Sequence, residues 1–172
     1  MLSSPVVFLV GFMGSGKSSV GALVASRLGV PFVDLDERVV AAARAPVSEI
    51  FACEGERGFR ARERVALIAL EPELAAGAVV ATGGGTSSDA ELGSWMSGRG
   101  RVIWLDTTLD EIEKRVVSDG SRPLFGDRTA LEQLYDARRP GYERSLHRID
   151  TTGHTLEEVV DLVVTVIRKP DE

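Results

Sequence analysis

A glycine-rich stretch near the amino terminus, GFMGSGKSS at residues 11–19, constrains the fold of this chain more than any other feature. It follows the apolar run Val6–Val10, and in the segment after it Val20, Val24 and Leu28 recur at helical spacing. The pattern Gly-x4-Gly-Lys-Ser between a strand and a helix is typical of loops that bind nucleoside triphosphates. We therefore predict an α/β fold that begins with a phosphate-binding loop.

The residue types in this loop suit phosphate binding. Glycines allow positive φ and let the backbone approach the phosphates closely, with successive N–H groups directed inward at a helix amino terminus. Lys17 is expected to reach the β- and γ-phosphates, and Ser18 to offer its hydroxyl to Mg²⁺. The expected nucleotide-binding set in the loop is Gly14, Ser15, Gly16, Lys17, Ser18 and Ser19.

Short apolar runs alternate with amphipathic segments along the rest of the chain. The runs predicted as strands are 6–10, 31–33, 78–81, 101–105 and 148–150. Capping boxes that predict helix starts are Ser88 with Glu91, Thr108 with Glu111, and Thr155 with Glu158. Such alternation favours a mostly parallel sheet flanked by helices, with ligands bound beyond the carboxyl ends of the strands.

The properties of the whole chain narrow the function further. Its 172 residues suit one domain, 1–172, and a formal charge of −6 argues against broad binding to nucleic acid or to a membrane surface. No apolar run approaches the ~18 residues that a membrane span needs, and no leader pattern is present, so we expect a cytoplasmic protein. The one cysteine, Cys53, cannot form an internal disulfide and is expected to be a passive, part-buried thiol.

Two carboxylates, Asp34 and Asp36, follow the apolar run at 31–33. On an extended backbone they would point the same way, which suits one carboxylate on a metal and one on an acceptor hydroxyl. The alternative is that Asp36 caps a helix starting near Glu37. Asp106, after the run at 101–105, is a second candidate for the metal, although it leads directly into the Thr108 capping box.

An arginine cluster and three consecutive glycines come next. The cluster consists of Arg57, Arg60, Arg62 and Arg64. A solvated helix face is the usual explanation for such a cluster, but one of its arginines can bind a carboxylate in a bidentate way. At 83–85 a predicted strand runs into Gly-Gly-Gly, and three glycines suggest that a ligand lies against bare backbone.

A polar stretch at about 118–128 is predicted to be a mobile lid, with an ordinary surface loop as the alternative. It is bracketed by Gly120 and Gly126 and carries Arg122. Lids exclude water, and an arginine in a lid can meet the charge on a phosphoryl group during its transfer.

The chain contains, in this order, the phosphate loop, Asp-x-Asp, Gly-Glu-x-x-Phe-Arg, Gly-Gly-Gly, Arg-Pro-Leu and Arg-x-Pro-x-Tyr. With these motifs in this order, it resembles shikimate kinases over roughly residues 6–164. The resemblance implies a P-loop kinase fold like that of nucleoside monophosphate kinases, with a five-stranded parallel sheet and a mobile lid. It also implies transfer of the γ-phosphate of ATP to the 3-hydroxyl of shikimate with Mg²⁺, in the pathway to chorismate and aromatic amino acids.

The same resemblance implies roles for particular residues in the substrate-binding region at about 34–64 and beyond it. Asp34 would be on the metal side with Ser18. Asp36 would bind substrate hydroxyls, Arg60 and Arg138 would grip the shikimate carboxylate, and Gly83, Gly84 and Gly85 would line the substrate. Lys17, Asp36 and Arg122 form the implied catalytic set. Arg115 would stack on adenine near the turn at 152–154, and the enzyme would act as a monomer.

Three departures and three alternatives accompany this resemblance. Ser145-Leu146 follows Tyr142 where the family commonly has Val-Ala. Gly141 and Phe125 stand where the family often has leucine. A gluconate kinase, a nucleoside monophosphate kinase and a nucleotide-binding module without catalysis stay open as other interpretations. The acceptor that stimulates ADP release distinguishes them.

Overall fold

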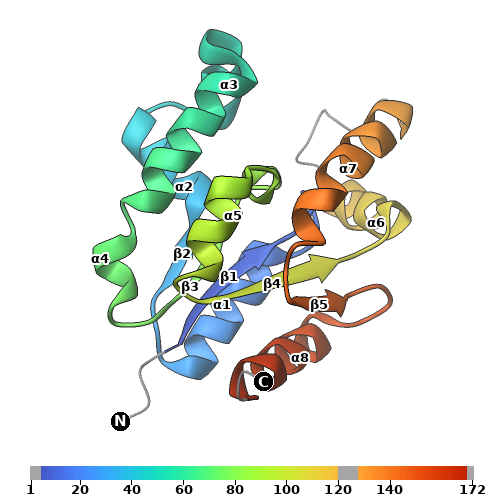
Figure 1. Cartoon of the computed structure of the whole chain (residues 1–172). Coiled ribbons are helices and arrows are strands. Elements are labelled where there is room, and N and C mark those ends of the chain that lie inside the picture. The colour runs from blue at the N-terminus through green and yellow to red at the C-terminus, as the bar shows by residue number, and fades with distance from the viewer. Residues whose placement is uncertain (1–4, 120–127, 170–172) are drawn as a thin grey trace.

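Five parallel strands form the central sheet in the computed structural model, which describes residues 5–119 and 128–169 (Figure 1). The sheet order is β2-β3-β1-β4-β5. The strands are β1 (Val6–Val10), β2 (Phe32–Asp34), β3 (Ala78–Ala81), β4 (Arg101–Asp106) and β5 (His147–Asp150). The predicted five-stranded parallel sheet is confirmed, and the bounds of β2, β4 and β5 differ from the predicted runs by one residue.

Helices cover both faces of the sheet. Successive residues of β1 point to opposite faces: Val7 and Leu9 pack with α1 (Lys17–Leu28) and α8 (Leu156–Arg168), while Phe8 and Val10 pack toward the opposite layer. Burial on both faces is the rule for parallel sheets and explains why the strands read as continuous apolar runs.

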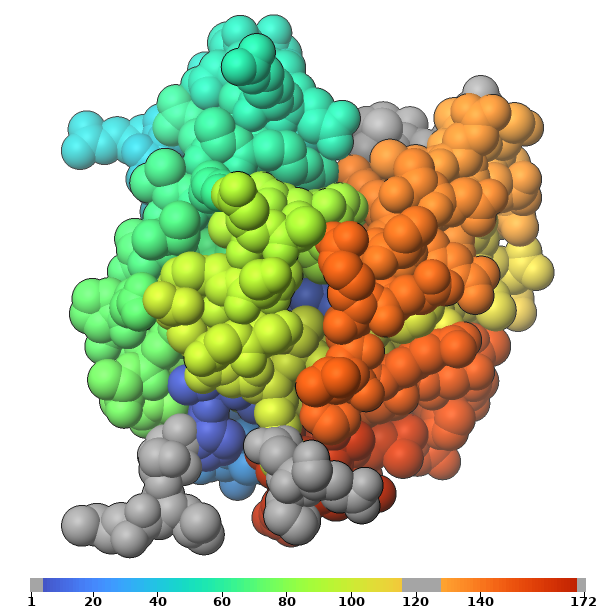
Figure 2. Space-filling view, viewed as in Figure 1, coloured from blue at the N-terminus to red at the C-terminus, as the bar shows by residue number. Residues whose placement is uncertain are grey.

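The opposite layer and the sheet edge hold the remaining helices (Figure 1). They are α2 (Leu35–Ala43), α3 (Val47–Ile68), α4 (Glu71–Leu74), α5 (Ala90–Ser97), α6 (Leu109–Asp119) and α7 (Arg128–Tyr142), together with the short 3₁₀ helix η1 (Thr86–Ser88). Helix α3 is broken at Gly55, whose φ is 68°. In Figure 2 part of the blue amino-terminal segment is visible at the bottom of a hollow between α5 and α7. None of the described helices is long and apolar enough to cross a membrane.

The helix starts test the predicted caps. Thr155 and Glu158 form the predicted capping box of α8, and the Thr108 hydroxyl accepts from the N–H of Glu111 at 3.3 Å. The Ser88 prediction is wrong. Asp89 caps α5 instead, because its carboxylate accepts from two backbone N–H groups of the first turn.

The prediction that Cys53 is part-buried is also wrong, since its side chain is exposed. Only Ile50 of this turn of α3 enters the core, in a small cluster with Val39 and Phe59. The helix breaks two residues after Cys53, at Gly55, so this turn does not follow the buried face of the later part of α3.

Candidate active site

Polar residues that follow β1, β2 and β3 gather at the carboxyl edge of the sheet. Strand β1 leads into the glycine-rich loop, β2 ends at Asp34, and β3 leads into Gly83. Because the strands are parallel, these three connections leave the same edge, which is where open α/β sheets bind their ligands.

The glycines of the phosphate loop are required by its backbone. Gly11, Gly14 and Gly16 have φ values of 147°, 76° and 93°, a region that other residues rarely adopt. A Cβ on Gly11 would also lie 2.5 Å from the carbonyl oxygen of Leu105. The loop therefore keeps its shape only with glycine at these positions.

Two polar side chains are held inside this loop. The buried ammonium of Lys17 donates to the carbonyl oxygens of Gly11, at 2.8 Å, and Phe12, at 2.9 Å. The hydroxyl of Ser15 is buried and finds no hydrogen-bond partner among the described residues. A cation and an unsatisfied hydroxyl at the amino terminus of a helix fit a chain of phosphates.

Ser18 and Asp34, the pair predicted for the metal, are in direct contact. The Ser18 hydroxyl donates to Asp34 Oδ2 at 2.5 Å, while Asp34 Oδ1 accepts from the N–H groups of Asp36 and Glu37. Hydroxyl and carboxylate oxygens are ligands that Mg²⁺ prefers, so the pair fits that ion. The alternative role of Asp36 as a helix cap is wrong, because Asp34 is the N-cap and α2 already begins at Leu35.

The three glycines after β3 lie against side chains of the site itself. A Cβ on Gly83 would lie 1.9 Å from Glu63 Oε1 and 3.1 Å from Asp36 Oδ1. A Cβ on Gly84 would lie 3.2 Å from Arg138 Nη1, and one on Gly85 2.5 Å from Arg60 Cζ. We call residues 83–85 the glycine wall. None of the three has a positive φ, so these glycines provide room for neighbouring side chains rather than an unusual backbone.

Arg60 lies between two glutamates of its own helix. Its guanidinium donates to Glu63 and, at 3.3 Å, to Glu56. Glu63 is fully buried and also accepts the Thr86 hydroxyl at 2.9 Å. Burial raises the pKa of Glu63 and the charge of Asp36 adds to the rise, while Arg60 and Thr86 oppose it. Burial by itself lowers the pKa of Arg60, but the two glutamates outweigh it and the net shift is upward.

Arg138 reaches the same region from α7. Its side chain is 11 % exposed, and its guanidinium lies 5.7 Å from the centre of the Phe12 ring in the phosphate loop. Burial lowers the pKa of Arg138, and the like charge of Arg60 lowers it further, while Tyr142 raises it. Two guanidiniums that face one region from separate helices are suited to a carboxylate ligand.

Comparison with known proteins agrees with this arrangement. The family model for shikimate kinase matches residues 13–168. The chain belongs to the shikimate kinase family. Two relatives named shikimate kinase come from Psychrobacter cryohalolentis, 44 % identical over 88 % of this chain and 82 % of that protein, and Persephonella marina, 38 % identical over 94 % and 98 %. The solved shikimate kinase from Acinetobacter baumannii in complex with shikimate is 34 % identical, with a TM-score of 0.84 over 95 % of this chain and 92 % of that one.

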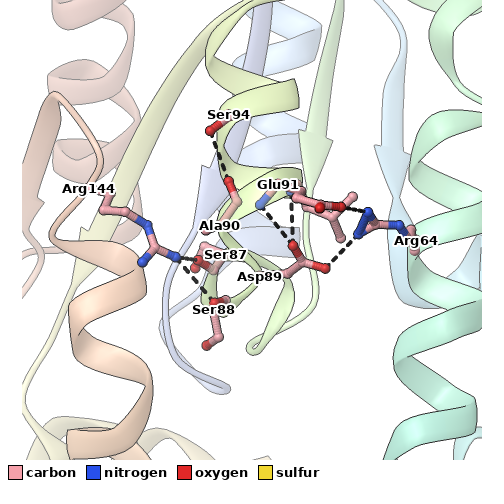
Figure 3. A network of polar contacts seen from close by, with 9 residues as sticks. Arg64, Ser87, Ser88, Asp89, Ala90, Glu91, Ser94 and Arg144 are labelled. Atoms are coloured by element: carbon pink, nitrogen blue, oxygen red, sulfur yellow. Dashed lines mark hydrogen bonds and ion pairs between the residues drawn. The ribbon is translucent and has the colours of Figure 1, made fainter.

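The four arginines of the predicted cluster have different partners and positions. Of the four predicted arginines only Arg60 enters the site. Arg62 pairs with Glu54 at 2.7 Å on the outer face of α3, and Arg57 is exposed. Arg64 binds Asp89 at 2.7 Å and also contacts Glu91, so it fastens the start of α5 to α3 (Figure 3).

The carboxyl end of α7 holds the turn that follows the glycine wall. Arg144 donates to the carbonyl oxygens of Ser87, at 2.6 Å, and Ser88, at 3.3 Å, on the side of the turn opposite Arg64 (Figure 3). A Cβ on Gly141 would lie 2.7 Å from the Ser87 carbonyl oxygen. The departure from the shikimate kinase pattern at Gly141 therefore has a physical reason, because α7 lies directly on the backbone of η1.

Asp106, the second metal candidate, is committed elsewhere. It accepts from the Tyr135 hydroxyl at 2.9 Å and from two nitrogens of Arg148, at 2.6 and 2.9 Å. Burial and this carboxylate raise the pKa of Tyr135 to about 12. Asp106 thus joins α7 to β4 and β5, whereas Asp34 contacts the loop serine.

Three other residues predicted to bind the nucleotide have different outcomes. Arg115 of α6 donates to the carbonyl oxygen of Thr151 at 3.2 Å, which puts it beside the turn at 152–154 as the resemblance implies. Arg122 and the middle of the predicted lid lie outside the described residues, and their roles stay predictions. Ser19 is exposed in the first turn of α1.

Sequence reasoning missed three residues that shape the acceptor region. They are Glu63, which carries no motif signal, and Glu56 and Tyr142, which belong to the motifs Gly-Glu-x-x-Phe-Arg and Arg-x-Pro-x-Tyr but were assigned no role. Both glutamates stand at helical spacing from Arg60. The Tyr142 hydroxyl donates to the carbonyl oxygen of Gly84. Burial raises the pKa of Tyr142, and the hydroxyl stays protonated as that hydrogen bond requires.

Proposed function

We propose that this member of the shikimate kinase family transfers the γ-phosphate of ATP to the 3-hydroxyl of shikimate. The observation that carries the proposal is the glycine wall. Carboxylates of Asp36 and Glu63 lie at its first glycine, and the guanidiniums of Arg138 and Arg60 lie at the other two. A small acceptor with hydroxyls at one end and a carboxylate at the other matches this order of charges.

We assign the nucleotide to the phosphate loop. Lys17 would exchange the carbonyl oxygens of Gly11 and Phe12 for the β- and γ-phosphates, and the loop N–H groups would donate to the remaining oxygens. Ser18 and Asp34 would hold Mg²⁺, which neutralises phosphate charge when bound. Arg115 would contact the adenine, and Arg122 would meet the transferring phosphoryl group.

We assign the acceptor to the glycine wall, at the same carboxyl edge of the sheet as the phosphate loop. Arg60 and Arg138 would hold its carboxylate, the backbone of the glycine wall would line it, and Asp36 would accept a hydrogen bond from the attacking hydroxyl. Glu63, fixed by Thr86, keeps the Arg60 guanidinium in place. Phosphoryl transfer depends mainly on positioning and charge neutralisation, which this division of roles supplies.

The setting proposed for the enzyme follows from the reaction. It would act in the pathway to chorismate and aromatic amino acids, as a cytoplasmic monomer with small-molecule substrates. The exposed, unpaired Cys53 suits a reducing compartment.

ADP release from MgATP tests the proposal. The assay compares shikimate, gluconate, nucleoside monophosphates and no acceptor. Saturable release that depends on shikimate supports the assignment. Release with gluconate instead would keep the phosphate loop and overturn the acceptor site, and ATP binding without stimulated release would favour a non-catalytic module.

A further inference from the structure

A carboxylate of the chain itself lies between the two arginines of the acceptor site. Glu56 Oε1 is 3.3 Å from Arg60 Nη2 and 3.8 Å from Arg138 Nη2. Glu56 directly follows Gly55, where α3 breaks, so it begins the second helical part of α3. Its position places one oxygen where a ligand carboxylate would meet both guanidiniums.

The two glutamates around Arg60 differ in how firmly they are held. Glu63 is 1 % exposed and is fixed by Arg60 and Thr86. Glu56 is 62 % exposed, and its contacts with the two arginines are at these longer distances. Exposed ion pairs are weak, so Glu56 can turn into solvent at little cost, whereas Glu63 cannot.

The charges explain why the pair needs a partner. Arg60 and Arg138 repel each other, and this repulsion contributes to the lowered pKa of Arg138. Glu56 acts in the opposite direction on both arginines. Glu56 thus offsets the repulsion between the two guanidiniums, which is the electrostatic role that an acceptor carboxylate would take over when it binds.

We propose that Glu56 is an internal substitute for the acceptor carboxylate, which occupies the arginine pair and is displaced when the acceptor binds. Glu56 therefore sets the affinity of the site for its acceptor and competes with weakly bound carboxylates. This inference rests on the proposed function, because it takes shikimate as the acceptor.

The first test is calorimetric binding of shikimate to the wild-type chain, Glu56→Gln and Glu54→Gln. Glu54→Gln is the matched control, since Glu54 lies on the same helix and pairs with Arg62 outside the site. We expect Glu56→Gln to lower the Kd for shikimate about two- to fivefold, the range that removal of an exposed ion pair can produce. The KM for shikimate should fall by the same factor, with the KM for ATP unchanged and the control like wild type.

Two further measurements separate direct contact from a general effect of charge. Glu56→Asp keeps the charge but shortens the side chain, so it should behave like Glu56→Gln if contact with both arginines matters. Acetate probes the arginine pair without hydroxyl contacts, and its inhibition constant against shikimate should fall in Glu56→Gln.

An unchanged or higher Kd in Glu56→Gln overturns the inference, since Glu56 would then be a bystander or a support for Arg60. A wild-type Kd in Glu56→Asp overturns it too, because remote charge would suffice. Failure of the proposed function looks different: the wild-type chain would neither bind shikimate nor release ADP with it.

Discussion

Replacing Gly85 by alanine tests the central packing feature of the acceptor site. The new Cβ would lie 2.5 Å from Arg60 Cζ, whereas carbon atoms pack best at about 3.5–4.0 Å. The backbone itself tolerates alanine, because Gly85 has φ −116° and ψ −2°. The Arg60 guanidinium must therefore move by about 1 Å or more, and its partial exposure gives it room to do so.

The expected loss follows from the contact that Arg60 would make. A hydrogen bond to a charged group contributes about 1.5–3 kcal/mol, and about 1.4 kcal/mol corresponds to a factor of ten. Gly85→Ala should therefore raise the KM for shikimate by about tenfold to 150-fold, with little change in the melting temperature or in the KM for ATP. Gly93→Ala is the control, since the nearest atom to its new Cβ would lie at 4.0 Å.

Steady-state kinetics in two backgrounds give the decisive comparison. If alanine acts by moving Arg60, it should add less than about twofold to the KM of an Arg60→Met variant, because coupled sites are not additive. An equal effect in both backgrounds would refute this reasoning, since alanine would then block the acceptor directly. A wild-type KM in Gly85→Ala would refute it as well.

Three other changes give separate expectations. Asp34→Asn should keep the helix cap and the melting temperature but need more Mg²⁺ for ADP release, while Asp34→Ala should also lose about 1 kcal/mol of stability; equal Mg²⁺ curves for Asn and wild type would argue against the metal role. The folded-state pKa of Glu63 is raised above 4.5, so its stabilising contribution is present below that pH and is lost as pH rises through the folded value. The free energy of unfolding, measured with urea at a series of pH values, should therefore fall less with rising pH in Glu63→Gln than in wild type. The same fall in both proteins would contradict the raised pKa. Gly141→Leu should cost about 1–3 kcal/mol by overpacking against η1, seen as a lower melting temperature, and an unchanged value would mean that α7 can move aside.

The sequence predicts the sheet and the phosphate side well because those features are local. The run Val6–Val10 and the glycines after it determine strand, loop and helix within a short segment. Asp34 and Asp36 were found as a pair for the same reason. Their division of roles depends on where α2 begins, because aspartate at either position can cap a helix, and α2 begins at Leu35 so that Asp34 is the cap.

Other features depend on contacts between distant residues. Ser88 and Asp89 are both good capping residues, and Asp89 caps α5 in the structure. Its carboxylate also accepts from Arg64, which is 25 residues away in the sequence, so local sequence does not show this contact. The role of Glu63 in the site becomes visible only through its hydrogen bond from Thr86, which is 23 residues later in the sequence. The sequence predicts that the glycine wall faces a ligand, but its contacts with Arg60 and Arg138 depend on the packing of α3 and α7 against η1.

The most direct test of the account is the position of the phosphate in the product. Proton–phosphorus correlation NMR of the product formed from MgATP and shikimate identifies the carbon that carries the phosphoryl group. The account predicts coupling of phosphorus to the proton on carbon 3 of shikimate. Phosphate on another hydroxyl, or release of ADP with only inorganic phosphate, would contradict it.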